Sequence, residues 1–257
     1  FYTYISTLHY VMEGCARKGI QLIVLDRINP HMHYVDGPVL EIKYTSFVGM
    51  HPVPVVYGMS IGEYALMING QGWLDDDLIC DLHIIKNTGF SRNDRVDISI
   101  PPPSPNLRNM NAISLYPSLC FFEGTILSAG RGTDYPFEIY GAPFLKTDFL
   151  FTPHANFGSN NPKFKDKICY GFDLRQDVNK PFIRANCLDI SYLMDAYNEV
   201  SAEYKAMFFN SFFNKLAGNK SLQENIINNT SEDKIRLSWK KDIDDFMIIR
   251  EKYLLYN

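Results

Sequence analysis

The first 25 residues show helical and then strand-like spacing of hydrophobic side chains. An apolar residue recurs every three or four positions, which marks one face of a helix, and the pattern stops at Gly19. The positions on this face are Ile5, Leu8, Val11, Met12 and Cys15. The apolar run from Gln21 to Leu25 then predicts a buried strand. A helix followed by such a strand indicates an α/β domain.

Two further elements of the same domain follow. Ser60 and Glu63 have the spacing of a capping box, which predicts a helix from Glu63 to Asn69, and Leu82 to Lys86 predicts a second strand. The helix and strand at the start are the second half of a βαβ unit, whose first strand should come before residue 1. We therefore expect an amino-terminal part of the domain to lie outside this chain. The chain alone should then expose part of a sheet and be unstable or inactive.

Residues 100–143 are rich in glycine, proline and small polar side chains. Such a long irregular stretch inside a compact protein is usually functional or disordered. Its aromatic residues argue against disorder because they bury enough area to hold loops in place. They are Tyr116, Phe121, Phe122, Tyr135, Phe137, Tyr140 and Phe144. We predict an ordered site built from loops.

The remainder of the chain is predicted to be helical. Residues 190–200 form one amphipathic pattern, and residues 208–216 form another that ends at Gly218. We expect the phenylalanines of the second pattern to lie in the core: Phe208, Phe209, Phe212 and Phe213. A capping signal at residues 230–233 predicts a short helix, and apolar spacing over residues 243–253 predicts the last one.

The length allows one large domain or two small ones, and the character of the chain changes near residue 100. The net charge of -4, from 25 Lys and Arg against 29 Asp and Glu, argues against nucleic acid as a partner. Charge-free apolar stretches such as Met110 to Phe122 are shorter than the roughly 20 residues that a membrane span requires, so we expect no span.

Several enzyme classes are excluded by motifs that the sequence lacks. The five cysteines have no zinc-site spacing, which leaves them as mainly buried thiols. The chain has no Walker-type phosphate loop, no His-Glu-x-x-His and no Gly-x-Ser-x-Gly. Carboxylates, arginines, asparagines and aromatic rings in glycine-rich loops remain. These groups suit a carbohydrate site, because acids act on glycosidic oxygens and arginine binds carboxylates.

Eight short motifs occur in an order that resembles one known family. They are Leu25-Asp26-Arg27-x-Asn29-Pro30, Asp36-Gly37-Pro38, Ser46-Phe47-Val48-Gly49, Gly58-Met59-Ser60-Ile61-Gly62-Glu63, Pro103-Ser104-Pro105-Asn106, Glu123-Gly124-Thr125, Gly130-Arg131-Gly132-Thr133-x-x-Pro136-Phe137-Glu138 and Gly141-Ala142-Pro143. Together they resemble the NamZ-type exo-β-N-acetylmuramidases, long catalogued as a domain of unknown function. Each motif is weak, but eight in order are specific.

The resemblance implies a two-part fold and an activity. Residues 1–100 would be the remainder of a Rossmann-like α/β domain without its amino-terminal part, and residues 101–257 would be an α+β domain, smaller than the complete first one. The active site would lie in the cleft between the two domains. Family members release terminal N-acetylmuramic acid from the non-reducing ends of peptidoglycan fragments, during cell-wall turnover. A periplasmic or secreted location in the cell envelope is implied too. The suspected catalytic acid, a Glu in a Glu-His-Gly stretch, would lie before Phe1, because no Glu-His pair occurs here.

Glu123 and Glu138 are the acids in the best-matched loops and are our candidate catalytic residues. Most glycosidases need one carboxyl group to protonate the leaving oxygen and a second group as base, nucleophile or orienter. We expect Glu123 to take part directly and Glu138 to orient Arg131. The alternative for each is a structural carboxylate that caps loop amides or pairs with an arginine. Retaining, inverting and substrate-assisted routes all stay open.

Arg131, between two glycines, is the candidate for binding the lactyl carboxylate of muramic acid. Arginine matches a carboxylate bidentately, and flanking glycines allow the backbone a close approach. Arg27 competes for this role, and Arg131 could instead hold its own loop through Glu138 or Asp134. The full set of candidate substrate-binding residues is Asp26, Arg27, Asn29, Ser104, Asn106, Arg131 and Thr133.

Two departures from the family pattern affect the loop after the first strand. Ile28 replaces a common proline, and His31 and Met32 replace glycines. Asp26 and Asn29 could therefore form only turn hydrogen bonds before Pro30.

Other functions are weaker. A non-catalytic module that binds peptidoglycan fragments is the main alternative. A nucleotide-dependent enzyme is a weaker alternative, because the sequence has no glycine-rich motif of the kind that binds nucleotide phosphates. We expect no cofactor and no metal. Only one pair of residues, His31-x-His33 with Asp26 and Asp36 nearby in sequence, has a spacing that suggests metal ligands, and we interpret these two histidines as loop residues. The oligomeric state is left open.

Overall fold

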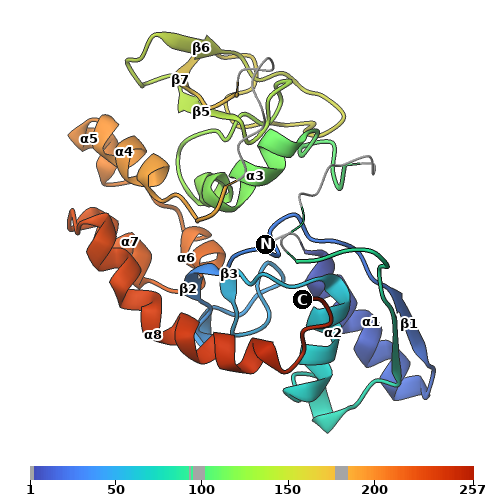
Figure 1. The fold of residues 1–257 in the computed structure, drawn as a ribbon. Coiled ribbons are helices and arrows are strands. Elements are labelled where there is room, and N and C mark those ends of the chain that lie inside the picture. The colour runs from blue at the N-terminus through green and yellow to red at the C-terminus, as the bar shows by residue number, and fades with distance from the viewer. Residues whose placement is uncertain (1–2, 93, 95–101, 177–184) are drawn as a thin grey trace. The chain divides into compact units, whose positions relative to one another are not determined.

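The computed structural model describes residues 3–92, 94, 102–176 and 185–257, and divides into two compact units (Figure 1). Unit 1 comprises Phe1–Val96 together with Arg236–Asn257, and unit 2 comprises Asp97–Ile235. The first boundary falls close to the change in character near residue 100. Nothing in the hydrophobic pattern predicts that residues 236–257 belong to unit 1.

Unit 1 contains the helix and strands that the sequence predicts. Helix α1 (Tyr4–Lys18) ends at Gly19, whose left-handed backbone (φ 61°) allows its N–H to reach the carbonyl of Ala16. Strands β1 (Leu22–Leu25) and β4 (Leu82–Ile85) pair in parallel in register Leu22 with Leu82. One face of this pair is open, as expected, because Ile23, Leu25 and Ile85 are 55%, 74% and 45% exposed.

Helix α2 (Ile61–Gly70) begins with the predicted capping box. The Ser60 hydroxyl accepts the Glu63 N–H at 3.1 Å, and the Glu63 carboxylate accepts the Ser60 N–H at 2.9 Å. The helix contributes Tyr64, Met67 and Ile68 to the core of unit 1, all fully buried. Unit 1 also contains an antiparallel pair and two short 3₁₀ turns: β2 (Asp36–Val39), β3 (Pro54–Val56), η1 (Ile42–Tyr44) and η2 (Asp75–Asp77).

The carboxyl-terminal helix corrects one prediction. Instead of a short helix and a separate last one, the chain forms a single helix α8 (Glu232–Glu251). The segment has no glycine or proline to interrupt it, and the ion pairs Lys240–Asp244 and Lys241–Asp245 join successive turns. Phe246 of this helix is buried in the core of unit 1.

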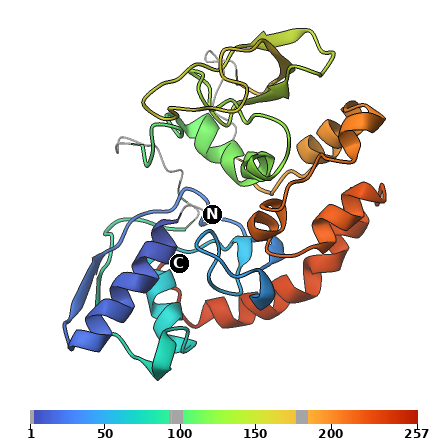
Figure 2. The same ribbon diagram turned by 180° about the vertical axis from the view of Figure 1, so that it is seen from behind.

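Unit 2 is built around a three-stranded antiparallel sheet. Its strands are β5 (Ile139–Ala142), β6 (Phe149–Phe151) and β7 (Cys169–Asp173), in the order β5-β7-β6. They lie in the yellow-green part of the ribbon in Figure 2. Gly141 and Gly171 face each other, and a Cβ on Gly171 would lie 1.9 Å from the Tyr140 carbonyl. Glycine at these positions is required by the close approach of the two strands.

Helices make up much of the rest of unit 2. They are α3 (Met110–Leu119), α4 (Ser191–Glu199), α5 (Ala202–Lys205), α6 (Phe213–Ala217) and α7 (Ser221–Ile227), with the 3₁₀ segment η3 (Cys120–Gly124) after α3. The amphipathic helix predicted over residues 190–200 is confirmed as α4. Helix α3 lies inside the stretch predicted to be irregular, so that prediction is wrong over residues 110–119. The side chain of Asn109 caps this helix by accepting the Ala112 N–H at 2.8 Å.

The helix predicted over residues 208–216 is only partly present, since α6 begins at Phe213. The preceding residues bond to another segment instead: the Phe208 carbonyl accepts the Ile126 N–H, and the Gly124 carbonyl accepts the Asn210 N–H. Phe208 and Phe213 are fully buried, but Phe212 is 37% exposed. Phe208 and Phe213 therefore lie in the core as predicted. Before Phe213, hydrogen bonds to residues 124–126 replace the helix that the spacing predicts.

Candidate functional site

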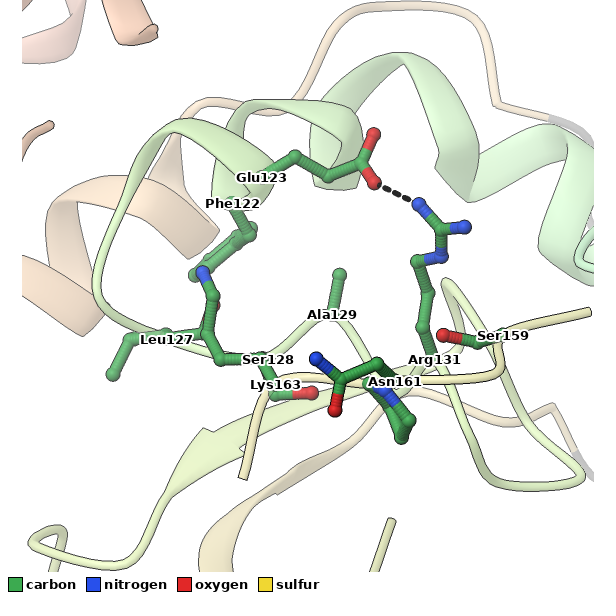
Figure 3. A pocket seen from close by; sticks show the side chains of 10 residues that line it. Phe122, Glu123, Leu127, Ser128, Ala129, Arg131, Ser159, Asn161 and Lys163 are labelled. Carbon is green, nitrogen blue, oxygen red and sulfur yellow. Dashed lines mark hydrogen bonds and ion pairs between the residues drawn. The ribbon is translucent and has the colours of Figure 1, made fainter. Parts of the chain in front are cut away.

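A pocket of about 350 Å³ lies in unit 2, where three segments meet (Figure 3). The end of η3, residues 127–131 and residues 159–163 contribute its lining. Its apolar wall is formed by the buried side chains of Phe122, Leu127 and Ala129. Its polar lining consists of Glu123, Ser128, Arg131, Ser159, Asn161 and Lys163.

Glu123 and Arg131 face each other across this pocket (Figure 3). The Arg131 Nη1 donates to the Glu123 carboxylate at 2.6 Å, and its Nη2 reaches the Gly158 carbonyl at 3.5 Å. The Arg131 Nε is buried and has no acceptor within the described ranges. In this arrangement Glu123 is a hydrogen-bond acceptor that holds the guanidinium.

Two glycines fix the position of Arg131. Gly130 and Gly132 adopt left-handed backbone angles, with φ 73° and 85°. A Cβ on Gly132 would also lie 2.5 Å from Pro162 and 2.8 Å from the His154 carbonyl. The Gly-Arg-Gly pattern is thus required by the path of the loop as well as by the close approach of its backbone to neighbours.

Lys163 supplies a second positive charge to the pocket. Its ammonium donates to the carbonyls of Thr125 and Leu127 at 2.6 and 2.7 Å, which leaves a third N–H without an acceptor in the part of the chain that the structure describes. The side chain stays exposed along the pocket, but the protein atoms around the ammonium disfavour its charge and lower its pKa to about 8. With Glu123, Arg131 and Lys163, the pocket carries one negative and two positive charges.

Glu138 does not orient Arg131, so that part of the prediction is wrong. Its two carboxylate oxygens accept from Asn111 at 2.9 Å and from Asn109 at 3.0 Å, and the residue is only 4% exposed. Because Asn109 also caps α3, Glu138 anchors the start of that helix beside β5. Both acids therefore have a structural role of the kind given above as the alternative. Glu138 accepts from two side-chain amides, and Glu123 pairs with an arginine.

Asp26 has a structural environment in unit 1. One carboxylate oxygen accepts the N–H groups of Arg27 and Gly62 at 2.8 and 2.7 Å, and the other accepts the hydroxyls of Ser60 and Tyr256 at 2.7 and 2.6 Å. A Cβ on Gly62 would lie 2.8 Å from the Asp26 carboxyl carbon. Asp26 is 9% exposed and joins the end of β1 to the start of α2 and to the end of the chain.

The other predicted binding residues also have local partners. Asn29 donates to the Met59 carbonyl at 2.9 Å and accepts the His31 N–H at 3.0 Å, which is the turn expected as the alternative. Ser104 accepts the Asn106 N–H. Asn106 donates to Gly158, next to the pocket.

Two residues remain from the predicted set. Thr133 donates to the Gly130 carbonyl at 2.7 Å and so stabilises the loop that carries Arg131. Arg27 lies in unit 1, where its N–H donates to the Asp26 carboxylate. Of the seven candidates, only Arg131 lines the pocket, while Asn106 and Thr133 support the segments that border it.

Comparisons with known proteins decide the family. A family model described as Exo-beta-N-acetylmuramidase NamZ, N-terminal, matches residues 1–111, and its C-terminal counterpart matches residues 114–256. This chain belongs to the NamZ family. The resemblance carried by the eight motifs is confirmed.

One curated NamZ protein and two solved structures are similar to this chain. The peptidoglycan beta-N-acetylmuramidase NamZ of Bacillus subtilis is 35% identical, and the chain spans 64% of its length. A crystal structure of a DUF1343 family protein from Bacteroides fragilis has 41% identity and a TM-score of 0.92, with all of this chain and 72% of that one covered. A second from the same organism has 26% identity and a TM-score of 0.79, covering 99% and 71%.

Lys163 is the functional candidate that sequence reasoning missed in this NamZ family member. It lies outside the eight motifs, in a loop with no spacing that marks a site, and only the fold brings it beside Glu123 and Arg131. Among the described residues, no group of three or more His, Cys, Asp or Glu side chains is arranged to hold a metal ion. None of the helices in the described ranges is both long and apolar enough to span a membrane.

Proposed function

We propose that this chain is part of an exo-β-N-acetylmuramidase, a glycoside hydrolase that releases N-acetylmuramic acid from the non-reducing ends of peptidoglycan fragments. Membership of the NamZ family and similarity to the Bacillus subtilis protein support a peptidoglycan-related glycosidase. The observation that carries the finer proposal is the charge of the pocket. One carboxylate and two cations leave an excess positive charge, which suits a ligand with a carboxylate.

In this proposal Arg131 and Lys163 bind the lactyl carboxylate, which distinguishes muramic acid from glucosamine. Glu123 is a positioning residue that holds the guanidinium, and Phe122 and Leu127 form the apolar wall. The third N–H of Lys163 and the weakly engaged Nη2 of Arg131 are the donors left for the ligand. No cofactor is needed for hydrolysis of this kind.

A second candidate function is a binding module that holds peptidoglycan fragments without cleaving them. The engagement of both predicted acids favours it, because Glu123 pairs with an arginine and Glu138 with two amides. Neither carboxyl group is poised here to give a proton to a glycosidic oxygen. The two functions share the same pocket and differ only in turnover.

Turnover of a chromogenic β-N-acetylmuramide separates the two functions. Release of the chromophore by the full-length protein of which this chain is proposed to be part, and its loss in Arg131→Met, would support the hydrolase. Binding of N-acetylmuramic acid by that protein without release would support the module. Failure to bind N-acetylmuramic acid at all would contradict both. The anomer released first then distinguishes retention from inversion.

Two further features belong to this proposal. We propose that unit 1 is Rossmann-like, since β1 and β4 pair in parallel beside α2. We also propose a location in the cell envelope and a role in cell-wall turnover, because peptidoglycan fragments arise there. Fractionation of cells with an antibody to the chain tests the location.

A further inference from the structure

Glu123 has a second carboxylate oxygen that the proposed function does not use. Its Oε1 accepts from the Arg131 Nη1 at 2.6 Å, and its Oε2 has no hydrogen-bond donor among the residues that the structure describes. Figure 3 shows this second oxygen directed away from the guanidinium. A carboxylate can only accept hydrogen bonds, so the free oxygen needs a donor from water or from a ligand.

The backbone around Glu123 is fixed by close packing. Gly124 follows it, and a Cβ at that position would lie 2.6 Å from the Phe213 Cα. The Gly124 carbonyl accepts the Asn210 N–H at 3.0 Å, and the Asn210 side chain donates to the Glu123 carbonyl at 3.5 Å. Because Arg131 holds the carboxylate as well, Glu123 presents Oε2 in a defined position in the pocket lining.

The free oxygen belongs to the same charge cluster as the two cations that are proposed to bind the ligand. Glu123 pairs with Arg131, and its negative charge also acts on the Lys163 ammonium. A ligand carboxylate on these cations would balance the charges of the pocket, two negative against two positive. A ligand seated on this ion pair displaces water from the free oxygen of Glu123. It must then supply a hydrogen-bond donor, because an acceptor left unpaired lowers the affinity.

The proposed ligand has hydrogen-bond donors next to its carboxylate-bearing group. In N-acetylmuramic acid the lactyl ether is on C3, between the acetamido N–H on C2 and the hydroxyl on C4. Both donors are on ring carbons adjacent to C3, which places them close to an acceptor beside Arg131. The hydroxyl on C4 is free only in the sugar at the non-reducing end. In every other sugar of a glycan strand with β-1,4 linkages, this oxygen is part of a glycosidic bond.

We propose that the Oε2 of Glu123 accepts a hydrogen bond from the free 4-hydroxyl of N-acetylmuramic acid and so restricts the pocket to the terminal sugar of a strand. This inference rests on the proposed function. An internal muramic acid has no proton on that oxygen and would leave the carboxylate unpaired, which disfavours its binding. Glu123 is thus a specificity-determining residue as well as the partner of Arg131.

Titration calorimetry of the full-length protein with three ligands tests this assignment. They are N-acetylmuramic acid, its 4-deoxy analogue, and an analogue with an acetoxy group in place of the acetamido group, which lacks the N–H. Wild type should bind the 4-deoxy analogue about 10-fold more weakly than N-acetylmuramic acid, because a hydrogen bond to a charged acceptor is lost. We expect no larger effect, since the Glu123 side chain is 28% exposed and water can replace the donor. The acetoxy analogue should bind like N-acetylmuramic acid.

Two variants separate contact with the hydroxyl from support of Arg131. Glu123→Ala removes both, so N-acetylmuramic acid and its 4-deoxy analogue should bind equally, and more weakly than N-acetylmuramic acid binds to wild type. Glu123→Gln keeps an oxygen for Arg131 but removes the charge, so the difference between the two ligands should fall to about 3-fold. The control Glu41→Ala, which removes an exposed glutamate paired with Lys43 in unit 1, should change neither affinity. Thermal unfolding verifies that each variant is folded.

The outcomes distinguish this inference from the proposed function. If wild type does not bind N-acetylmuramic acid, the proposed function fails, and this inference with it. If wild type binds N-acetylmuramic acid and the 4-deoxy analogue equally, only the inference is wrong. It is also wrong if folded Glu123→Ala keeps the wild-type ratio of the two affinities, because a residue that only holds Arg131 would lower both by the same factor. Weaker binding of the acetoxy analogue alone would assign Glu123 to the acetamido group and contradict the inference too.

Discussion

Arg131 combines an ion pair with unused hydrogen-bonding capacity, and this sets what a substitution at that position should do. We expect Arg131→Lys to lower affinity for N-acetylmuramic acid about 10-fold, because lysine lacks the planar fork that matches a carboxylate. N-Acetylglucosamine, which has no carboxylate, should bind with unchanged affinity. Titration calorimetry with both sugars measures the discrimination.

The control for this substitution is Arg17→Lys, which alters an exposed arginine paired with Asp76 in unit 1 and should have no effect on binding. If Arg131→Lys folded normally and kept full discrimination, the lactyl carboxylate would have to bind elsewhere. Arg27 would then be the next residue to test.

Lys163 makes binding depend on pH. Because its pKa lies at about 8, the ammonium loses its proton as the pH rises through that value, and with it the attraction for a carboxylate. We expect affinity for N-acetylmuramic acid to fall about 3- to 10-fold between pH 7 and pH 9.5. Lys163→Met should bind weakly throughout and lose the pH dependence. The same fall in Lys163→Met would assign the effect to another group.

For single residues, the sequence predicts where a side chain lies better than it predicts which residue that side chain contacts. The Gly-Arg-Gly pattern locates Arg131 because the two left-handed glycines are local properties of the loop. The partner of Arg131 depends instead on how η3 and the loop meet, so Glu123 takes the place predicted for Glu138. Lys163 has no local signal at all.

Asp26 shows how one residue determines the arrangement of several elements. We expect Asp26→Asn to lower the free energy of unfolding by about 2–3 kcal/mol, because an amide nitrogen cannot accept and two of the four donors lose their acceptor. Urea denaturation measures the change. Asp242→Asn, on the exposed surface of α8, is the control and should change little.

The opposite result would restore Asp26 as a ligand. In that case Asp26→Asn would unfold like wild type and yet lose affinity for N-acetylmuramic acid. The four hydrogen bonds make this outcome unexpected, since each oxygen already has two donors.

Elements with local signals are predicted well, and elements set by tertiary contacts are not. The capping box of α2 and the left-handed end of α1 depend on a few adjacent residues, and both are present. The segment before α6 has helical spacing, but its backbone bonds to residues 124–126 instead. Helix α8 is continuous because nothing between its two predicted halves breaks it.

The stability of the whole molecule should fall in acid because of His51. This residue is 3% exposed, stacks on Trp73 and lies 3.0 Å from both the His9 ring and the Tyr64 hydroxyl. Burial and the neighbouring His9 lower its pKa to about 3, so the folded chain resists a proton that the unfolded chain takes up below about 6.5.

The expected loss of unfolding free energy is up to about 1.4 kcal/mol per pH unit as the pH falls from 6.5 towards 3. His9 contacts Glu13 at 3.4 Å, and other groups titrate in this range, so the test compares slopes. Urea denaturation of His51→Gln between pH 7 and pH 4 should give a shallower decline than wild type. Equal slopes would exclude His51 as the cause.

The last residues of the chain complete unit 1. Tyr256 bonds to Asp26, the Leu255 N–H to Glu63, and the Arg92 N–H to the Asn257 carbonyl. Unit 2 is continuous in sequence, but unit 1 is not. During synthesis, unit 2 is therefore free to fold while the ribosome is still producing residues that unit 1 awaits. Contacts that join residues 230 positions apart form slowly, so the amino-terminal part of unit 1 keeps the surface that these contacts cover exposed until the last residues arrive.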